Sequence, residues 1–322
     1  MRIPNPIALA ALFSGLITLV SAHQNTFPLG RGIAQDNLAL EEVPLDVVPL
    51  VPHQQGAEPL SPQETEAAAK QLASSIALSL ITHEAHEGIE DIAARLPPEA
   101  APFAGALHRP GTWSTGRIIY PQLGGLLPGG ASVMVVVEQM WAEPEGVHVE
   151  WRTLDIRLIR TGGIWQVASL ESNGGEPLAP PANLSPEALA VLADPRIELP
   201  DSARWDIYAG LVSPKLLALL ARMAEWDGFG VVTFSTGHPW EVFGTARQSD
   251  HSRGLAVDIY RLGPDLVIDQ RQTGSRVHQF VQWLYQQPEV RQIGSPWALD
   301  GRGGRSFTDA LHQDHLHIAV YP

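Results

Sequence analysis

The chain has 322 residues and no cysteine, which excludes disulfide bonds and thiolate metal ligands. Its formal net charge is −14, from 21 basic and 35 acidic residues, and this opposes non-specific attraction to nucleic acid. A chain of this length can bury two ordinary hydrophobic cores. We therefore expect a folded protein with no nucleic-acid partner.

The first 22 residues have the pattern of a signal peptide. Arg2 precedes an apolar stretch from Ile7 to Val20, and Val20-Ser-Ala22 satisfies the small-residue cleavage rule. The apolar stretch is too short to favour a stable membrane span. We expect a periplasmic or secreted protein with no stable membrane span after cleavage. Residues 23–60 show no sustained period and are predicted to be a flexible leader.

Residues 61–175 have the pattern of a helix followed by an antiparallel sheet. Ser61-Pro-Gln-Glu64 is a helix-start signal, and apolar residues recur at helical spacing within 61–95. Four strand-like runs follow, at 117–123, 131–142, 147–160 and 164–172. The segment Thr161-Gly-Gly-Ile-Trp-Gln-Val-Ala-Ser169 resembles the last hairpin of nuclear-transport-factor-2-like domains, which implies that fold for this region.

A Pro-rich connector over 176–200 is predicted to separate this region from a second domain over 201–322. Apolar residues at helical spacing predict helices from Ser213 to Trp226 and from Ser275 to Gln287. Short strands are predicted over 231–234, 255–260 and 315–320. The predicted fold class is therefore α+β with two domains, the second having helices beside an antiparallel sheet.

Two segments of the second domain concentrate metal-ligand side chains. They are Ser249-Asp-His251-Ser-Arg-Gly254-Leu-Ala-Val-Asp258 and His312-Gln-Asp314-His315-Leu-His317. If their strands are neighbours, His251, Asp258 and His317 can close three corners of a tetrahedron. Imidazole and carboxylate suit a catalytic Zn²⁺ site, where three protein ligands leave one position for water. We predict one Zn²⁺ per chain, with His312, Asp314 and His315 beside its open position.

These two segments resemble the LAS zinc peptidases. That family includes D-Ala-D-Ala dipeptidases and carboxypeptidases, penicillin-insensitive murein endopeptidase and the zinc-bearing hedgehog domain. The resemblance covers roughly residues 210–322 and implies zinc ligands at His251, Asp258 and His317. It also implies that His315 contacts the substrate or the transition state. By position, Asp314 is the first candidate for the general base, with His312 the alternative.

The chain departs from this family in a segment that binds substrate. Many members carry a Ser-Gly-Tyr-Arg type segment upstream, whereas this chain has Phe234-Ser-Thr-Gly-His238-Pro-Trp240 and lacks the Arg. Arg247 and Arg305 are candidates to replace it, because a guanidinium pairs with a carboxylate in two places. His238 is the third candidate for substrate binding. Trp240, Phe243, Trp297 and Phe307 lie in loops near the motifs, and we expect them to pack in the core rather than to line a substrate groove.

The resemblance implies a zinc metallopeptidase that hydrolyses bonds involving D-amino acids in peptidoglycan stem peptides or crosslinks. Its action would be that of an endopeptidase or a carboxypeptidase, and peptidoglycan peptides would be its partners. Two alternatives stay open. In one, the zinc-bearing domain binds wall fragments or a protein partner without turnover. In the other, the sheet of the N-terminal domain holds a small ligand and is the functional part.

Overall fold

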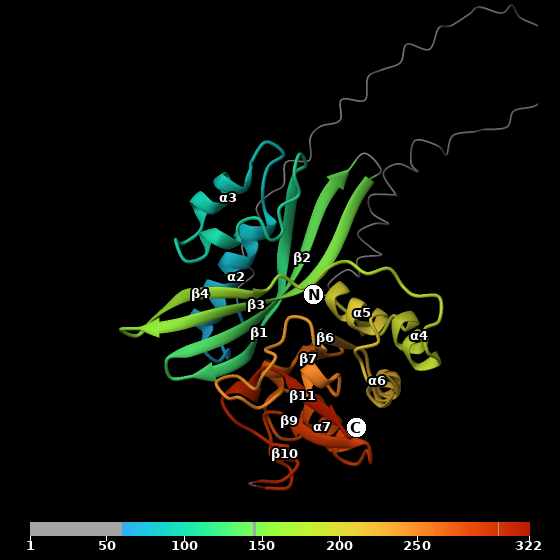
Figure 1. Cartoon of the computed structure of the whole chain (residues 1–322). Coiled ribbons are helices and arrows are strands. Elements are labelled where there is room, and N and C mark those ends of the chain that lie inside the picture. Colours follow the sequence, from blue (N-terminus) through green and yellow to red (C-terminus); the bar gives the residue numbers. More distant parts are fainter. Residues whose placement is uncertain (1–59, 144–145, 302) are drawn as a thin grey trace, which may run out of the picture. The chain divides into compact units, whose positions relative to one another are not determined.

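The computed structural model describes residues 60–143, 146–301 and 303–322. The predicted signal peptide over 1–22 and all of the predicted leader except Leu60 lie outside these residues. The described part of the chain belongs to one unit, Pro52–Pro322, and contains helices and two sheets (Figure 1). The predicted α+β class is therefore confirmed.

The first sheet has four antiparallel strands in chain order. They are β1 (Ser114–Leu127), β2 (Gly130–Glu143), β3 (Gly146–Thr161) and β4 (Ile164–Ser172). Each contains one of the four predicted runs. Gly162 and Gly163, with φ of 59° and 86°, form the two-residue turn between β3 and β4 that such positive φ values allow. This part of the fold therefore follows directly from the strand-like runs of the sequence and the turns between them.

Helix α2 (Ala67–Ile81) packs its buried face against this sheet. The predicted start at Ser61 is wrong, since the helix begins only after Glu66 (φ 51°) and the Glu64 side chain is bound to Lys70 and Tyr120 instead. The helical pattern is also interrupted after Ile81. There His83 pairs with Ser114 in an antiparallel bridge, and the chain resumes as α3 (Ile89–Arg95) and η1 (Ala101–Phe103).

The second sheet has strand order β10-β9-β11-β7-β6-β5. Its strands are β5 (Ile197–Glu198), β6 (Phe229–Thr233), β7 (Ala256–Leu262), β9 (Val290–Gly294), β10 (Ser306–Phe307) and β11 (Leu316–Val320), and β8 (Asp265–Leu266) pairs with β7. The four central strands are antiparallel, but β5–β6 and β9–β10 are parallel. The predicted antiparallel sheet is thus a mixed one. A parallel neighbour needs a crossover connection, which two helices provide between β5 and β6.

Helices beside this sheet form the second core. They are α4 (Pro186–Ala193), α5 (Asp201–Tyr208), α6 (Pro214–Trp226) and α7 (Arg276–Tyr285), and the last two match predicted helices. The predicted connector over 176–200 contains α4 and β5, and its Val191 and Ile197 are buried in the second core. This core therefore begins inside the predicted connector. The division into two domains stays a prediction.

A small third cluster joins the two sheets. Tyr120, Met134 and Val136 of the first sheet pack with Val232 and Tyr260 of the second. Thr153 also donates a hydrogen bond from Oγ1 to the Val232 carbonyl at 2.5 Å. Across the described ranges, no helix combines the length and apolarity that a membrane span requires.

Candidate metal centre

Two adjacent strands bring Asp258 and His317 face to face. Strands β7 and β11 pair antiparallel, with Asp258 directly opposite His317. Directly opposite residues project from the same face of a sheet, so their side chains meet. The Nδ1 atom of His317 lies 3.0 Å from Oδ1 of Asp258. The spacing within each motif thus translates into one shared site.

A tight turn brings His251 to the same point. His251 opens η2 (His251–Arg253), which ends at Gly254 with φ 67°. A Cβ at Gly254 would lie 1.8 Å from the Leu211 carbonyl oxygen, so only glycine fits this turn. The buried His251 ring donates its Nδ1–H to the Phe234 carbonyl at 2.6 Å. This bond leaves Nε2 as the atom that can bind a metal.

Three ligand atoms therefore converge: His251 Nε2, Asp258 Oδ1 and His317 Nδ1. The two imidazole nitrogens are 3.0 Å apart, and they lie 3.2 Å and 3.0 Å from the carboxylate oxygen. A tetrahedral Zn²⁺ with bonds of about 2.0–2.1 Å would hold its ligand atoms roughly 3.3 Å apart. This ligand triangle fits such an ion with little rearrangement.

The protonation states of the ligand triangle also suit a metal. Burial pushes the pKa of Asp258 upward, but the His251 and His315 imidazoles outweigh burial and hold that pKa well below its usual value. Burial lowers the pKa of His317 to about 4, although Asp258 opposes this shift. A carboxylate and a neutral imidazole are the forms that bind metals, and both are present at neutral pH.

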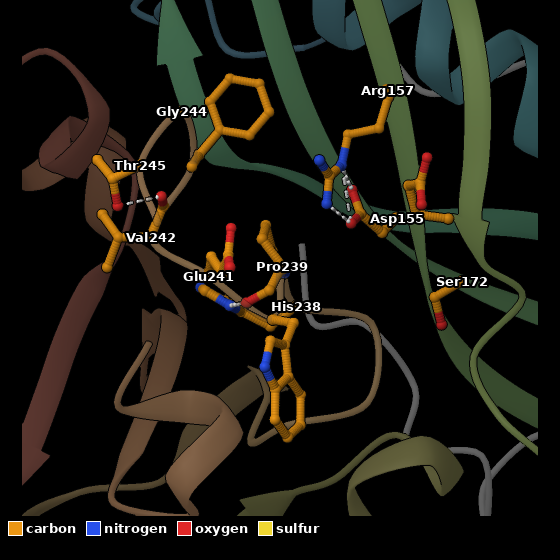
Figure 2. A pocket seen from close by; sticks show the side chains of 12 residues that line it. Asp155, Arg157, Ser172, His238, Pro239, Glu241, Val242, Gly244 and Thr245 are labelled. Atoms are coloured by element: carbon orange, nitrogen blue, oxygen red, sulfur yellow. Dashed lines mark hydrogen bonds and ion pairs between the residues drawn. The ribbon is translucent and has the colours of Figure 1, made fainter. Parts of the chain in front are cut away.

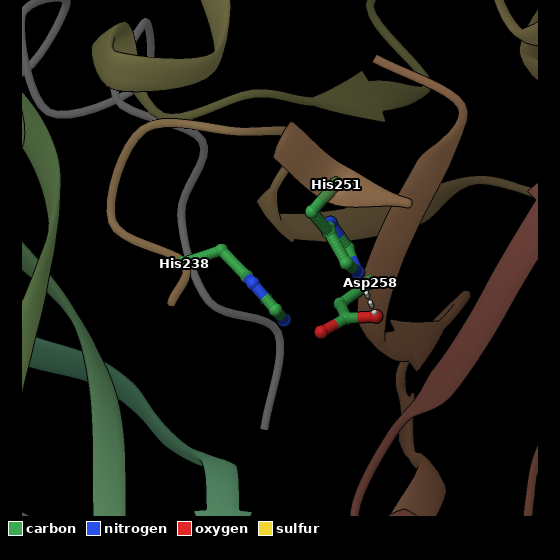
Figure 3. Close-up of side chains that lie close together, drawn as sticks. All are labelled: His238, His251 and Asp258. Carbon is green, nitrogen blue, oxygen red and sulfur yellow. Dashed lines mark hydrogen bonds and ion pairs between the residues drawn. The ribbon is translucent and has the colours of Figure 1, made fainter. Parts of the chain in front are cut away.

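His238 adds a further ligand side chain (Figure 3). Its ring stacks on that of His251, with centroids 3.9 Å apart and planes at 14°. Ligand atoms of His238, His251 and Asp258 all lie within 4.8 Å of one another, and this largely buried group could hold a metal ion. Burial, with the adjacent His251, holds the pKa of His238 well below its usual value, so the ring is neutral.

Two ligand sets therefore share His251 and Asp258 and differ in their third member. His317 lies 3.0 Å from both shared ligand atoms. His238 donates its Nδ1–H to the Pro239 carbonyl at 2.7 Å, which leaves its Nε2 free as an acceptor. The distances favour the set with His317, and they leave His238 beside it as a fourth ligand or a contact for a bound group.

Asp314 and His315 form a sealed pair next to the ligand triangle. His315 donates its Nδ1–H to Asp314 Oδ1 at 2.6 Å, and its Nε2 lies 3.8 Å from Asp258 Oδ2. Asp314 is 0% exposed, and its Oδ2 pairs with Lys70 and accepts the Leu123 N–H at 3.1 Å. Burial favours a higher pKa, but Lys70 and His315 lower the pKa of Asp314 to about 2. Since every carboxylate oxygen has a protein partner, the geometry favours orientation of His315 over the predicted base role.

His312 and Asp309 form a second pair that reaches solvent through Asp309, whereas the His312 ring is largely buried. His312 donates its Nδ1–H to Asp309 Oδ1 at 2.7 Å, and its ring centroid lies 5.0 Å from that of His315. Gly294 makes room for this ring, because a Cβ there would lie 2.4 Å from His312 Cδ2. The Asp309 side chain is 48% exposed, so this pair can exchange protons with solvent.

One of the two predicted substrate-binding arginines, Arg305, makes its contacts within the fold. Arg305 donates to the carbonyls of Val290 (3.0 Å) and Tyr285, and it lies over the Tyr285 ring at 4.1 Å. Its guanidinium is therefore engaged in the fold. Arg247 is exposed, and its role in substrate binding stays a prediction. His238 is a candidate that the structure does bring to the ligands, since its ring stacks on that of His251.

A cavity of about 450 Å³ opens beside His238 (Figure 2). Residues 238–245 form one side, and residues of β3 and β4 form the other. On the sheet side, Arg157 and Asp155 form a two-point ion pair at 2.7–3.0 Å. Trp240 and Phe243 line the cavity, and Trp240 is 65% exposed. For these two aromatic residues, the groove-lining interpretation therefore fits better than burial in the core.

Sequence reasoning missed two residues that contact this site from the first sheet and its helix. Gln122 donates Nε2–H to Asp258 Oδ2 at 2.7 Å, and Lys70 pairs with Asp314. Their partners lie 136 and 244 residues away along the chain, so no local motif could mark them. One signal was present, because Lys70 is one of only two lysines in the chain and lies on a predicted apolar helix face.

No family model matches this chain, and neither the curated proteins nor the solved structures contain a significant match.

Proposed function

We propose that this chain is a zinc-dependent peptidase that hydrolyses bonds involving D-amino acids in peptidoglycan. The carrying observation is the convergence of His251 Nε2, Asp258 Oδ1 and His317 Nδ1 at 3.0–3.2 Å, next to two carboxylate-oriented imidazoles. Two nitrogen donors and one oxygen donor suit one Zn²⁺ ion with an open position. The substrate class comes from the resemblance of the two motif segments to the LAS zinc peptidases.

Beside the ligand triangle, His312 and His315 would carry out the proton transfer and the stabilisation of the oxyanion. When bound, zinc would acidify a water molecule and polarise the scissile carbonyl. His312 serves as the general base, because Asp309 holds its Nδ1–H and leaves Nε2 to accept the proton. His315 donates from Nε2 to the developing oxyanion. Burial disfavours the charged form of His315, but the Asp258 and Asp314 carboxylates raise its pKa and so favour it.

Asp314 orients His315 in this proposal and does not act as the base. A general base must reach the proton it removes, directly or through one water molecule. The Oδ1 atom of Asp314 holds His315, and Oδ2 holds Lys70 and the Leu123 N–H. The base role therefore passes to His312, the alternative among the sequence-based candidates.

Two further features support the proposed peptide substrate and the proposed periplasmic or secreted location. The cavity beside His238 presents the exposed Trp240 ring and polar side chains of β3 and β4 to an extended peptide. The predicted signal peptide over 1–22 is consistent with a periplasmic or secreted enzyme, where peptidoglycan is accessible. We therefore propose that stem peptides bind along this cavity and that the bond to be cleaved lies at the ligand triangle.

Incubation of the purified protein with intact peptidoglycan sacculi tests this function. Released muropeptides are identified by mass, with zinc-loaded protein, chelator-treated protein and the His251→Ala variant compared. A His278→Ala variant is the matched control, since this buried imidazole packs on Trp297. We expect cleavage by the zinc-loaded wild type and by the control alone. Tight metal binding and muropeptide binding with no cleavage would instead support the binding-module alternative.

A further inference from the structure

Strand β1 of the first sheet contacts β7 at the ligand Asp258. Tyr120 and Gln122 are two residues apart, so they project from one face of β1. Their partners are also two apart on β7. The Tyr120 ring stacks on Tyr260 at 4.9 Å and 16°, and Gln122 donates to Asp258 Oδ2 at 2.7 Å. Since Oδ1 of Asp258 faces the imidazole ligands, the first sheet holds the opposite oxygen of the same carboxylate.

Lys70 of α2 makes an equivalent contact with Asp314. The Lys70 side chain is 0% exposed, and its Nζ pairs with both Asp314 and Glu64. The Tyr120 hydroxyl donates to Glu64 Oε1 at 2.8 Å, which ties this carboxylate to β1. β1 is an edge strand, and the N–H of its Leu123 donates to Asp314 at 3.1 Å. The helix and the first sheet thus supply two donors to the carboxylate that orients the candidate catalytic imidazole.

This buried ionic network is a poor source of stability. Removing an ammonium group and two carboxylates from water costs free energy that their attraction only partly returns. The face of α2 around Lys70 consists of small and apolar residues, among them Ala69, Ala73 and Ala77, which an apolar side chain would suit better. The network does, however, fix the rotamer and ionised form of Asp314. It thereby determines which nitrogen of His315 faces the ligand triangle.

We propose that Gln122 and Lys70 are positioning residues of the metal centre, so that the region 60–172 completes a site whose candidate ligands all lie after residue 237. Gln122 orients the ligand Asp258, and Lys70 orients His315 through Asp314. The assigned effect on catalysis rests on the proposed peptidase function. The assigned effects on metal affinity and on the His315 ring do not depend on that function.

The Gln122→Leu variant tests the first contact without any activity assay. It keeps the side-chain size but removes the donor to Asp258. Removal of such an outer-shell partner typically weakens metal affinity by about 10- to 100-fold. Affinity is measured for Zn²⁺ by competition with a chromophoric chelator, with the Co²⁺ absorption spectrum as a probe of geometry.

Gln139→Leu is the matched control for this variant. Gln139 is also a buried glutamine of the first sheet, but it donates to the Leu107 carbonyl and to Ser114, away from the ligands. Each of the two glutamines also has an amide oxygen without a partner among the described residues. The proposal requires weakened metal binding in Gln122→Leu and affinity within about 2-fold of wild type in Gln139→Leu.

The Lys70→Met variant tests the second contact. We expect a kcat lower by about 10- to 100-fold, with KM changed much less and Zn²⁺ still bound. In histidine-labelled protein, the Nδ1–H resonance of His315, identified by its loss in His315→Gln, should broaden or disappear. Arg152→Met is the control, since Arg152 is a buried cation paired with Glu150 on β3.

Three results would overturn the proposal. One is wild-type metal affinity in Gln122→Leu, and another is equal weakening in Gln139→Leu. The third is an unchanged His315 resonance in folded Lys70→Met. If Lys70→Met does not fold, the two glutamine variants decide the outcome. A wild type that binds metal but cleaves no muropeptide would refute the proposed function, while the affinity and resonance measurements would still test the positioning roles.

Discussion

The two Asp–His pairs beside the ligand triangle have the same local chemistry in different surroundings. In both, an imidazole Nδ1–H is held by an aspartate, and both carboxyls have a pKa of about 2. Asp314 is 0% exposed and paired with Lys70, whereas the Asp309 side chain is 48% exposed. The difference indicates that a sealed pair can orient a ring, while an open pair can also exchange its proton with water.

Both Asp–His pairs flank the ligand triangle, so we expect removal of a metal ligand to have the largest effect. We expect His251→Ala to lose tight metal binding completely, together with hydrolysis, because both ligand sets contain His251. Metal content after dialysis, measured by mass spectrometry, checks this outcome. We expect the same loss for His317→Ala and retained metal for His238→Ala. The opposite result for those two variants would assign the third ligand position to His238.

The next effect separates the roles of the open and sealed pairs. His312→Gln should lower kcat by about 10²–10⁴-fold, the usual cost of losing a general base, while zinc stays bound. Asp314→Asn should lower kcat by about 10- to 100-fold, as expected for a residue that acts through another. Steady-state hydrolysis of a purified muropeptide provides both values. If the two variants ranked in the reverse order, Asp314 would be the base.

The pH dependence of the free energy of unfolding should also distinguish Asp314 from Asp309. The pKa of Asp314 is about 2 in the folded protein against a usual 3.8, a depressed value. Its stabilisation is therefore fully present above the unfolded pKa and is lost as the pH falls from about 4 to 2, with a size of about 2 kcal/mol. Asp314→Asn should lower the free energy of unfolding at pH 6 by about this amount, since the buried Lys70 also loses one of its two carboxylate partners. Urea unfolding from pH 6 to pH 2.5 should show the difference shrinking, and a constant difference would argue against this origin.

Asp309→Asn should have the smallest effect on stability. The pKa shift of Asp309 has the same direction and the same pH window, but nearly half of its side chain is exposed. Solvent screening should hold its contribution below about 1 kcal/mol. The same urea titration measures it. A loss as large as that of Asp314→Asn would show that the open pair is sealed in solution.

Much of the fold could be predicted because the relevant patterns are local. Four strand-like runs between residues 117 and 172 predicted the four strands in chain order, and the apolar spacing around Leu216 and Phe280 matched α6 and α7. The beginning of α2 could not be read from Ser61, because the chain turns at Glu66 (φ 51°) before the helix begins, and the Glu64 side chain pairs with Lys70 and Tyr120. The edge strands β5 and β10 have two residues each, too short to carry a periodic pattern.

The sequence by itself determined that Asp258 and His317 would meet if their strands were neighbours, since strand periodicity decides which side chains share a face, and that His251 lies in the loop that enters the strand of Asp258. Only the tertiary structure decided what surrounds them. The stacking of His238, the burial of Lys70 and the contact of Gln122 with Asp258 depend on how the elements pack. Packing also sealed one Asp–His pair and left the other open. Exposure and long-range pairing are set by elements far apart in the chain, and no local spacing encodes them.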